Sequence, residues 1–265
     1  MLMAVNVGNS RISVGFFADD VCDLCAQFQI ATDLRKTSDE YLCLIRSIVR
    51  EEGLSVDAIT GAILSSVVPQ LTNTVSEALL RLTGIRPLVV GPGVKTGFPI
   101  KIDSPSELGG DMVANTAAVL RKVGRKAAII ADLGTVTTIS AINRNGEYVG
   151  CCIAPGVGIS FESLHGKTAQ LPNVMLSDAG KAIGKNSQDA VLSGVILGHA
   201  MMLDGFVARF AKELKCQPEE LSLVMTGEYA TMVASSCRRS FELDSELTLK
   251  GLFILYHNTV QNAEL

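Results

Sequence analysis

A duplicated strand-and-turn pattern constrains the fold of this chain more than any other feature. Residues 3–13 read MAVNVGNSRIS and residues 129–140 read IIADLGTVTTIS, each an apolar strand that runs into a glycine flanked by small hydroxyl or amide residues. In this alignment Asn6 of the first copy corresponds to Asp132 of the second. The sequence therefore predicts a protein built by internal duplication of one strand-rich unit.

Three predicted strands open each half of the chain, over residues 2–6, 11–17 and 21–29 and again over 127–132, 136–143 and 147–153. Segments with helical spacing follow each trio, and the first of them has Ser38 as its expected N-cap. This pattern predicts a mixed α/β fold of two lobes with any ligand in the cleft between them. We expect lobes of residues 1–117, completed by a terminal amphipathic helix of 247–265, and of 118–246.

Composition excludes several classes of protein. The chain has 265 residues, a formal net charge of −4 and no basic run longer than a dipeptide, so we expect no nucleic-acid partner. The long apolar segment 190–210 is interrupted by His199, Asp204 and Arg209, and is expected to be a core or interface helix, not a membrane span. The N-terminal stretch lacks the pattern of a secretory leader, which favours a cytoplasmic protein.

The cysteines do not form a recognisable metal or disulfide framework. There are seven, an odd number, and Cys22 and Cys25 make a CxxC pair without a second pair at zinc-site spacing. We expect these two to be packing residues of a strand, and the adjacent Cys151 and Cys152 to be small apolar residues of a buried strand.

The two glycine turns suggest an anion-binding function. A strand that ends in such a turn offers backbone N–H groups with no Cβ in the way, and two turns in register suit the two ends of a triphosphate. The relevant groups are Gly8, Asn9, Ser10 and Arg11 in the first turn, and Gly134, Thr135, Thr137 and Thr138 in the second. A pair of ordinary hairpin turns is the alternative.

Two carboxylates are candidates for chemistry. Asp111 follows Gly109-Gly110 where a small-residue helix is expected to begin, so it is either a functional acid or an ordinary helix-start aspartate. Asp132 ends a strand that is predicted to be buried on both faces. Buried carboxylates are rare without a cation or hydrogen-bond donors, which favours a bound ion there.

Ten short motifs carry a family resemblance that covers nearly the whole chain: NVGNSRISVGFF, SSVVP, GPGVKTG, DSPSELGGDMVAN, DLGTVTTIS, IAPGVGIS, LPNV, IGKNSQDAVLSG, VMTG and LTLKGL. In this order and spacing the chain resembles the type III pantothenate kinases. The resemblance implies an actin-like fold of two RNase H-like domains and a homodimer. It also implies transfer of the ATP γ-phosphoryl group to the hydroxyl of pantothenate, the first step of coenzyme A biosynthesis, with Mg²⁺ and a monovalent cation, K⁺ or NH₄⁺.

The same resemblance assigns roles to individual residues. It implies that Asp111 is the proton acceptor and that Asp132 is a ligand of the monovalent cation. Its nucleotide contacts are Asn6, Val7, Gly8, Asn9, Ser10, Arg11, Ile12, Ser13 and Thr135. Its substrate contacts are Gly109, Gly110, Asp111, Met112 and Ser187.

The chain departs from the family pattern at five positions: Asn6 replaces Asp, Ile102 replaces Tyr, Met112 replaces Arg, Ser187 replaces Thr and Glu228 replaces Gly. Loss of the Arg fork is expected to weaken binding of a carboxylate substrate, and the neutral Asn6 to weaken Mg²⁺ binding. Three hypotheses remain open. The chain is a pantothenate kinase with altered activity, a non-catalytic regulatory relative, or a kinase for another hydroxylated acceptor.

Overall fold

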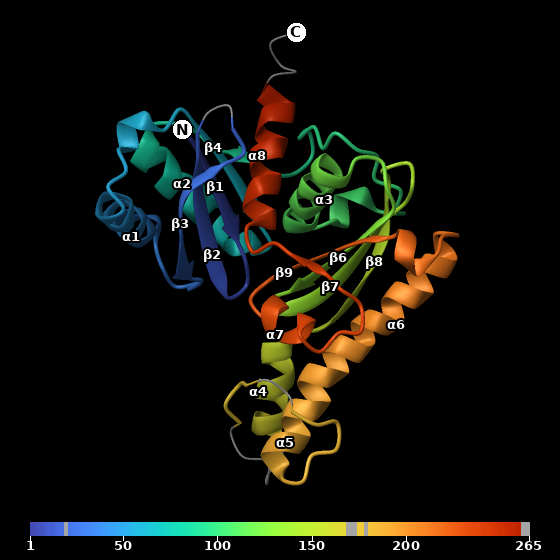
Figure 1. The fold of residues 1–265 in the computed structure, drawn as a ribbon. Coiled ribbons are helices and arrows are strands. Elements are labelled where there is room, and N and C mark those ends of the chain that lie inside the picture. Colours follow the sequence, from blue (N-terminus) through green and yellow to red (C-terminus); the bar gives the residue numbers. More distant parts are fainter. Residues whose placement is uncertain (19–20, 168–173, 178–179, 261–265) are drawn as a thin grey trace. The chain divides into compact units, whose positions relative to one another are not determined.

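The computed structural model describes residues 1–18, 21–167, 174–177 and 180–260. It divides into two compact units. The first consists of Met1–Phe98, Asp103–Ala118 and Glu246–Leu265, and the second of Pro99–Ile102 and Val119–Ser245. Each unit contains one five-stranded mixed sheet, labelled in Figure 1, so the expected α/β class is confirmed.

The sheet of the first unit has the order β3-β2-β1-β4-β5. Its strands are β1 (Leu2–Val7), β2 (Arg11–Phe17), β3 (Leu24–Ala31), β4 (Gly61–Ser66) and β5 (Leu88–Val89). The first three form an antiparallel meander, whereas β4 and β5 run parallel to β1. The central β1 is buried along almost its whole length, which accounts for its nearly continuous run of apolar residues.

Helices cover both faces of this sheet. Met3, Val5 and Val7 of β1 pack in one cluster with residues of α1 (Ser38–Glu51) and α2 (Pro69–Thr83). The opposite face carries α8 (Leu247–Val260) and the start of α3 (Gly110–Val123), which Figure 1 shows on the other side of β1 from α1 and α2. Short 3-10 turns occupy Val56–Ala58 and Pro105–Glu107.

Two helix predictions need correction. The N-cap of α1 is Thr37, not Ser38, because Thr37 and Glu40 form a reciprocal capping box. The terminal helix is not amphipathic: α8 is buried on several sides, from Leu247 to Leu255, since it lies between the sheet and α3. Residues 261–265 of the predicted helix lie outside the described residues.

The sheet of the second unit repeats this design with the order β10-β9-β6-β7-β8. Its strands are β6 (Ala128–Leu133), β7 (Val136–Ile142), β8 (Tyr148–Pro155), β9 (Ser222–Thr226) and β10 (Glu242–Leu243). The burial patterns of β1 and β6 are identical, as are those of β2 and β7. Gly146, in the turn between β7 and β8, has φ 75°, as the Asn-Gly pair there requires.

Asn6 and Asp132 occupy equivalent positions in the two sheets. Each is the fifth residue of its six-residue strand, and each pairs with the third residue of the next strand, Ser13 or Thr138. On the parallel side Asn6 pairs with Ser65 of β4, and Asp132 with Thr226 of β9. The internal duplication read from the sequence is therefore confirmed at the level of strand register.

The helices of the second unit are α4 (Val157–Lys167), α5 (Ser187–Leu192), α6 (Gly198–Glu213) and α7 (Ala230–Ala234), with a 3-10 turn at Pro218–Glu220. A π-helical turn, Ser193–Leu197, joins α5 to α6. The combined segment Ser187–Glu213 is the one helix of the described residues long and apolar enough to cross a bilayer. Because 44% of its most apolar window is buried inside the protein, a core helix accounts for it.

The cysteine prediction is wrong for two residues. None of the seven cysteines, all of which are among the described residues, forms a disulfide, but Cys25 and Cys151 are exposed, while Cys22 and Cys152 are only partly buried. The reason is sheet topology, because β3 and β8 are edge strands on which alternate side chains face solvent.

Candidate functional site

The turn after β1 is a tight hairpin held by backbone bonds. Gly8 N donates to Arg11 O at 2.9 Å, and a Cβ at Gly8 would lie 3.0 Å from the same oxygen. Thr32 Oγ1 donates to Gly8 O at 2.7 Å, and Thr32 N to Ser10 O at 3.0 Å. Gly8 thus closes the turn, whereas Asn9 and Ser10 are exposed at its tip.

Beside this turn, three polar side chains share one face of the first sheet. Asn6, Ser13 and Ser65 are in register on β1, β2 and β4, so their side chains point to the same side. Asn6 Oδ1 and Ser65 Oγ are both buried without a hydrogen-bond partner. Ser13 Oγ accepts a bond of 3.4 Å from Gln29. Because buried polar atoms normally have partners, Asn6 and Ser65 mark a place built for polar contacts.

The start of α3 packs on these residues. A Cβ at Gly110 would lie 2.8 Å from Ser65 Oγ, and one at Gly109 would lie 2.6 Å from Asp111 Oδ1. These two glycines therefore let the backbone approach β4 and leave room for the carboxyl group of Asp111. Met112, the next residue, is buried.

Asp111 lies at the start of α3 with a perturbed carboxyl group. Its Oδ1 accepts a bond of 2.7 Å from Met112 N at the N-terminus of α3. Burial raises the pKa of its carboxyl group above 3.8, against the lowering effect of these backbone bonds. A carboxyl group whose pKa is raised towards the working pH is a better proton acceptor than an ordinary aspartate.

In the second unit Asp132 lies between glycines. A Cβ at Gly227 would lie 2.7 Å from Asp132 Oδ1, and one at Gly134 would lie 3.7 Å from it. Gly227 also has φ 98°, a conformation that other residues rarely adopt. The neighbouring Thr226 is buried and pairs with Asp132 along β9. A small cation could approach this carboxylate without meeting a side chain at either glycine.

The turn after β6 is backed by the end of β8. A Cβ at Gly156 would collide with the carbonyl oxygens of Gly134 and Thr135, so this close approach of two backbones requires glycine. Thr137 Oγ1, at the start of β7, is buried without a hydrogen-bond partner. The second turn thus combines close backbone packing with an unsatisfied hydroxyl group, as expected of a phosphate-binding loop.

Ser187 lies apart from these residues along the chain. It opens α5 directly after the N-cap Asn186, whose Oδ1 accepts from Asp189 N at 2.8 Å, and it is exposed. Figure 1 shows α5 beside α4 at the end of the long helix.

The residues present fit the groups that the resemblance implies to different degrees. The backbone turns at Gly8–Arg11 and Gly134–Thr135 fit a nucleotide phosphate, and Asp132 fits a cation. A protein-held Mg²⁺ fits poorly, because the three polar side chains on this face of the first sheet, Asn6, Ser13 and Ser65, are neutral. The described residues contain no group of three or more His, Cys, Asp or Glu side chains that could hold a metal ion.

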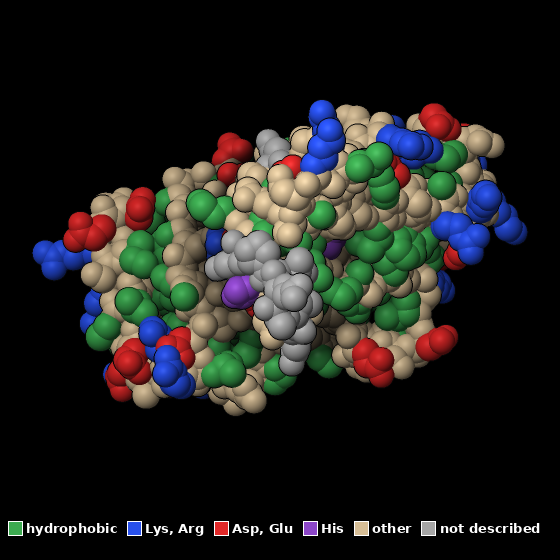
Figure 2. Space-filling view, turned by 90° about the horizontal axis from the view of Figure 1, so that it is seen from below, with side chains coloured by type: hydrophobic (Ala, Val, Ile, Leu, Met, Phe, Trp, Pro, Cys, Tyr) green, Lys and Arg blue, Asp and Glu red, His purple; other side chains and the backbone are tan. Residues whose placement is uncertain are grey.

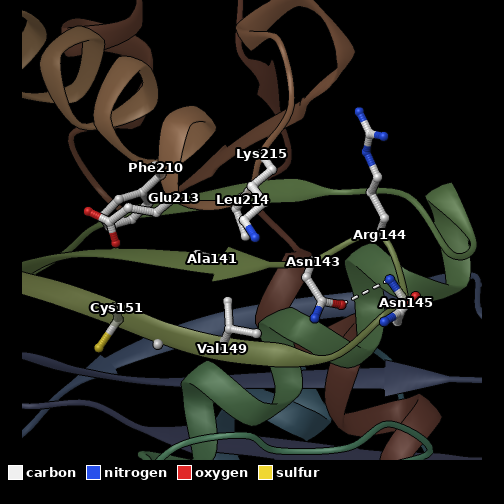
Figure 3. Close-up of a pocket in the computed structure, with 11 residues that line it drawn as sticks. Ala141, Asn143, Arg144, Asn145, Val149, Cys151, Phe210, Glu213, Leu214 and Lys215 are labelled. Atoms are coloured by element: carbon white, nitrogen blue, oxygen red, sulfur yellow. Dashed lines mark hydrogen bonds between the residues drawn. The ribbon is translucent and has the colours of Figure 1, made fainter.

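Two surface hollows among the described residues of the second unit do not coincide with the predicted site residues. One has a volume of about 730 Å³ and lies between the β7–β8 hairpin and the end of α6 (Figure 3), where Asn143 Oδ1 accepts from Asn145 N at 2.9 Å. The other, of about 560 Å³, is lined by Met201, Asp204, Gly205, Ala208, Arg238 and Arg239. Neither brings a carboxylate together with unsatisfied polar atoms.

Sequence reasoning did not single out four residues of these sites: Ser65, Gly156, Thr226 and Gly227. A usable signal exists for two of them. In β4 and β9, Ser65 and Thr226 each directly follow an unbroken run of at least two apolar residues. Each therefore marks the point where a buried strand becomes polar. The two glycines are recognisable only from the backbones that they contact.

Comparisons with known proteins agree with this architecture. The family model described as type III pantothenate kinase matches residues 2–209. A type III pantothenate kinase of Moorella thermoacetica is 38% identical over 256 residues, covering 97% of this chain and 98% of its own length. One from Pelobacter propionicus is 40% identical over 260 residues, with the same coverage.

Solved structures show the same fold at low sequence identity. A conserved putative Baf family transcriptional activator from Campylobacter jejuni has a TM-score of 0.57 at 17% identity, covering 99% of this chain and 100% of its own. A ROK family glucokinase from Streptomyces griseus, in complex with glucose and AMPPNP, has a TM-score of 0.55 at 13% identity, covering 98% and 99%. The fold is that of the actin-like ATPases and ROK kinases. With its full-length match to curated relatives, this chain belongs to the type III pantothenate kinase family of phosphotransferases.

Proposed function

We propose that this chain transfers the γ-phosphoryl group of ATP to the hydroxyl group of pantothenate, the first step of coenzyme A biosynthesis. Family membership supports the reaction. Asp111 links this reaction to specific residues. Its carboxyl group has a raised pKa and lies at the start of α3, beside the polar face of β1 and β4.

In this proposal Asp111 accepts the proton of the attacking hydroxyl group. The turns at residues 6–13 and at Thr135 bind the nucleotide, largely through backbone groups, and Asp132 binds a monovalent cation, K⁺ or NH₄⁺. Gly109, Gly110, Met112 and Ser187 contribute to binding of the acceptor. Since phosphoryl transfer has a loose transition state, positioning and charge neutralisation account for most of the rate, and the base for a smaller part.

The test is a coupled assay of ATP turnover with and without pantothenate, applied to the wild-type chain, Asp111→Asn and a matched control. Asp57→Asn is that control, because Asp57 is an exposed residue of a 3-10 turn in the same unit. We expect pantothenate-dependent turnover in the wild type and in Asp57→Asn, and its loss in Asp111→Asn. Absence of turnover in the wild type across millimolar Mg²⁺ and K⁺ would refute the proposal.

A second candidate is a kinase for a different hydroxylated acceptor. The observation that favours it is Met112, which is buried and apolar directly after Asp111, so that no cation follows the base to pair with a substrate carboxylate. The same assay decides between the two when pantothenate is replaced by its alcohol analogue, pantothenol. Higher kcat/KM with pantothenol would favour the second candidate, and no ATP turnover with either would favour a regulatory protein.

The homodimer and the cytoplasmic location also belong to this proposal. On the long helix, a Cβ at Gly194, Gly198 or Gly205 would meet nothing, and Met201 is 60% exposed. Ile153 of the edge strand β8 is 66% exposed. Figure 2 shows hydrophobic side chains on one face of the molecule, among mixed basic and acidic ones. Analytical ultracentrifugation tests the dimer, and Met201→Glu should weaken it if this helix contributes to the interface.

A further inference from the structure

The motif LTLKGL, residues 247–252, opens α8 and is not part of the site described above. Two of its residues contact α3. A Cβ at Gly251 would collide with the carbonyl group of Ala114 and would lie 2.8 Å from its Cα atom, so the two helix backbones meet there without a side chain between them. Glycine is unfavourable inside a helix, and this close crossing accounts for its presence in α8.

A hydrogen bond fixes the same crossing. Thr248 Oγ1 donates to Asn115 Oδ1 at 2.8 Å, between residues that are 133 positions apart in the sequence. Asn115 is only 3% exposed. Thr248 and Gly251 are three residues apart on α8, so they lie on one face of that helix. The bond therefore holds α3 in one register on α8, because a slide or rotation of α3 would take this donor away from a buried amide oxygen.

Both contacts lie one helical turn from the proposed base. Ala114 and Asn115 follow Asp111 by three and four residues, which places them on the same side of α3 as Asp111. A displacement of the helix at Asn115 therefore also displaces Asp111. Because Gly110 packs closely on Ser65 of β4, the start of α3 is held by both β4 and α8.

The helix α8 is itself packed on the strand that follows the first glycine turn. A Cβ at Gly15 of β2 would lie 2.9 Å from Leu249 Cδ1, and the ring centroids of Phe17 and Phe253 are 5.1 Å apart. β2 begins directly at the turn that is proposed to bind nucleotide phosphate. α8 thus connects this strand to α3, and it determines where the base lies relative to the turn.

We propose that Thr248 is a positioning residue for phosphoryl transfer: its hydroxyl group holds α3 in register on α8 and thereby sets the position of Asp111 relative to the nucleotide turn. In this role Thr248 acts through Asp111 and not on the substrates. The inference rests on the proposed function, since it names what holds the base of the same site. Phosphoryl transfer depends mainly on positioning, and a misplacement of about 1 Å can lower the rate by about a hundredfold.

The experiment compares Thr248→Val, which keeps the shape of the side chain and removes the hydroxyl group, with Thr248→Ser, which keeps the hydroxyl group. The readouts are kcat with pantothenate and the Kd of AMPPNP, a non-hydrolysable ATP analogue, measured by calorimetry. For Thr248→Val we expect kcat to fall by about tenfold and the Kd to stay within about twofold of the wild type, because the base moves and the nucleotide turn does not. Thr248→Ser should keep about half or more of the wild-type kcat, since serine supplies the same donor.

Thr72→Val is the matched control. Thr72 is a partly buried threonine of α2 in the same unit, and its Oγ1 donates within its own helix, to Val68 O at 3.3 Å. Its loss removes a local bond without changing a contact between α3 and α8. Thr72→Val should keep the kcat and the Kd of the wild type.

A double-mutant cycle with Asp111→Asn separates positioning of the base from a general loss of structure. The residual rate of Asp111→Asn is measured by transfer of radiolabelled phosphate from ATP at high enzyme concentration. If Thr248 acts through Asp111, adding Thr248→Val should change this residual rate by less than about twofold. A general structural defect would lower it by the same factor as in the wild-type background.

Four results overturn the inference. They are a wild-type kcat in Thr248→Val, an equal loss of kcat in Thr248→Ser, a loss of AMPPNP affinity as large as the loss of kcat, and an equal loss with and without the Asp111 carboxylate. In each of these cases the wild type still phosphorylates pantothenate, so the proposed function stands. If the wild type shows no pantothenate-dependent turnover, the proposed function fails and the inference fails with it.

Discussion

Gly110→Ala tests how closely the start of α3 packs against β4, and therefore how the position of Asp111 is fixed. In the structure a Cβ at residue 110 would lie 2.8 Å from Ser65 Oγ and 3.2 Å from Val90 Cγ1. Carbon atoms in optimal contact are about 3.5–4.0 Å apart, so the helix start must move by roughly half an ångström or more. Asp111, the next residue, moves with it.

The magnitude follows from two opposing effects. Overpacking a well-filled site costs about 1–3 kcal/mol, while alanine is about 1 kcal/mol better than glycine within a helix. We expect a net loss of stability of about 1 kcal/mol. Ser65→Ala removes both the closest contact and an unpartnered hydroxyl group, so in that background Gly110→Ala should cost less, with a coupling of about 1 kcal/mol between the two sites.

The assay is urea unfolding followed by far-UV circular dichroism, since the chain has no tryptophan. The four proteins of the cycle are compared with Gly91→Ala, where a Cβ would meet nothing within 4 Å. kcat is measured in parallel, and Gly110→Ala should lower it because the base is displaced. If the two substitutions are additive to within about 0.5 kcal/mol, Gly110 does not pack on Ser65 as described.

Four further predictions concern Asp111, Gly227 and Asn6. Asp111→Asn should lower kcat by about 10²–10⁴-fold. Because burial raises the pKa of Asp111, its stabilising contribution is present at low pH and lost as pH rises through the raised pKa, so Asp111→Asn should be more stable than the wild type at pH 7 but not at pH 3, measured by urea midpoints. Gly227→Ala should destabilise the protein by about 1–3 kcal/mol in the same assay, since its φ is 98° and a Cβ would lie 2.6 Å from the Leu133 backbone. Asn6→Asp should lower the Mg²⁺ concentration for half-maximal activity by roughly tenfold in a turnover titration.

Much of the fold could be predicted from the sequence because the repeat encodes it twice. The strands around Asn6 and Asp132 share apolar spacing and a terminal glycine, and strand register depends directly on that alternation. The Asn145-Gly146 pair likewise requires the positive φ found at Gly146. These features are local, so they can be recognised without knowledge of the tertiary structure.

The remaining features depend on neighbours that are distant in sequence. Cys25 and Cys151 are exposed because their strands lie at sheet edges, and strand order is not visible in the strand itself. Ser65 acquires its significance only when Gly110, which is 45 residues away, packs on it. The roles of Asn9, Ser10, Thr135 and Ser187 in binding remain predictions.

The comparison of the two sheets explains why a duplicated protein keeps one amide and one carboxylate. Identical burial patterns and registers show that packing alone does not require either group at the fifth position of the strand, because the same backbone accommodates both. The difference must then come from what each position contacts outside the sheet. At position 6 the register partner on the parallel side is Ser65, on which Gly110 at the start of α3 packs closely. At position 132 the neighbours include Gly227 and Gly134, which place no side chain against the carboxylate. The amide at position 6 and the carboxylate at position 132 therefore reflect different surroundings of one strand position, and the response of Asn6→Asp shows how well the first sheet accepts a charge there.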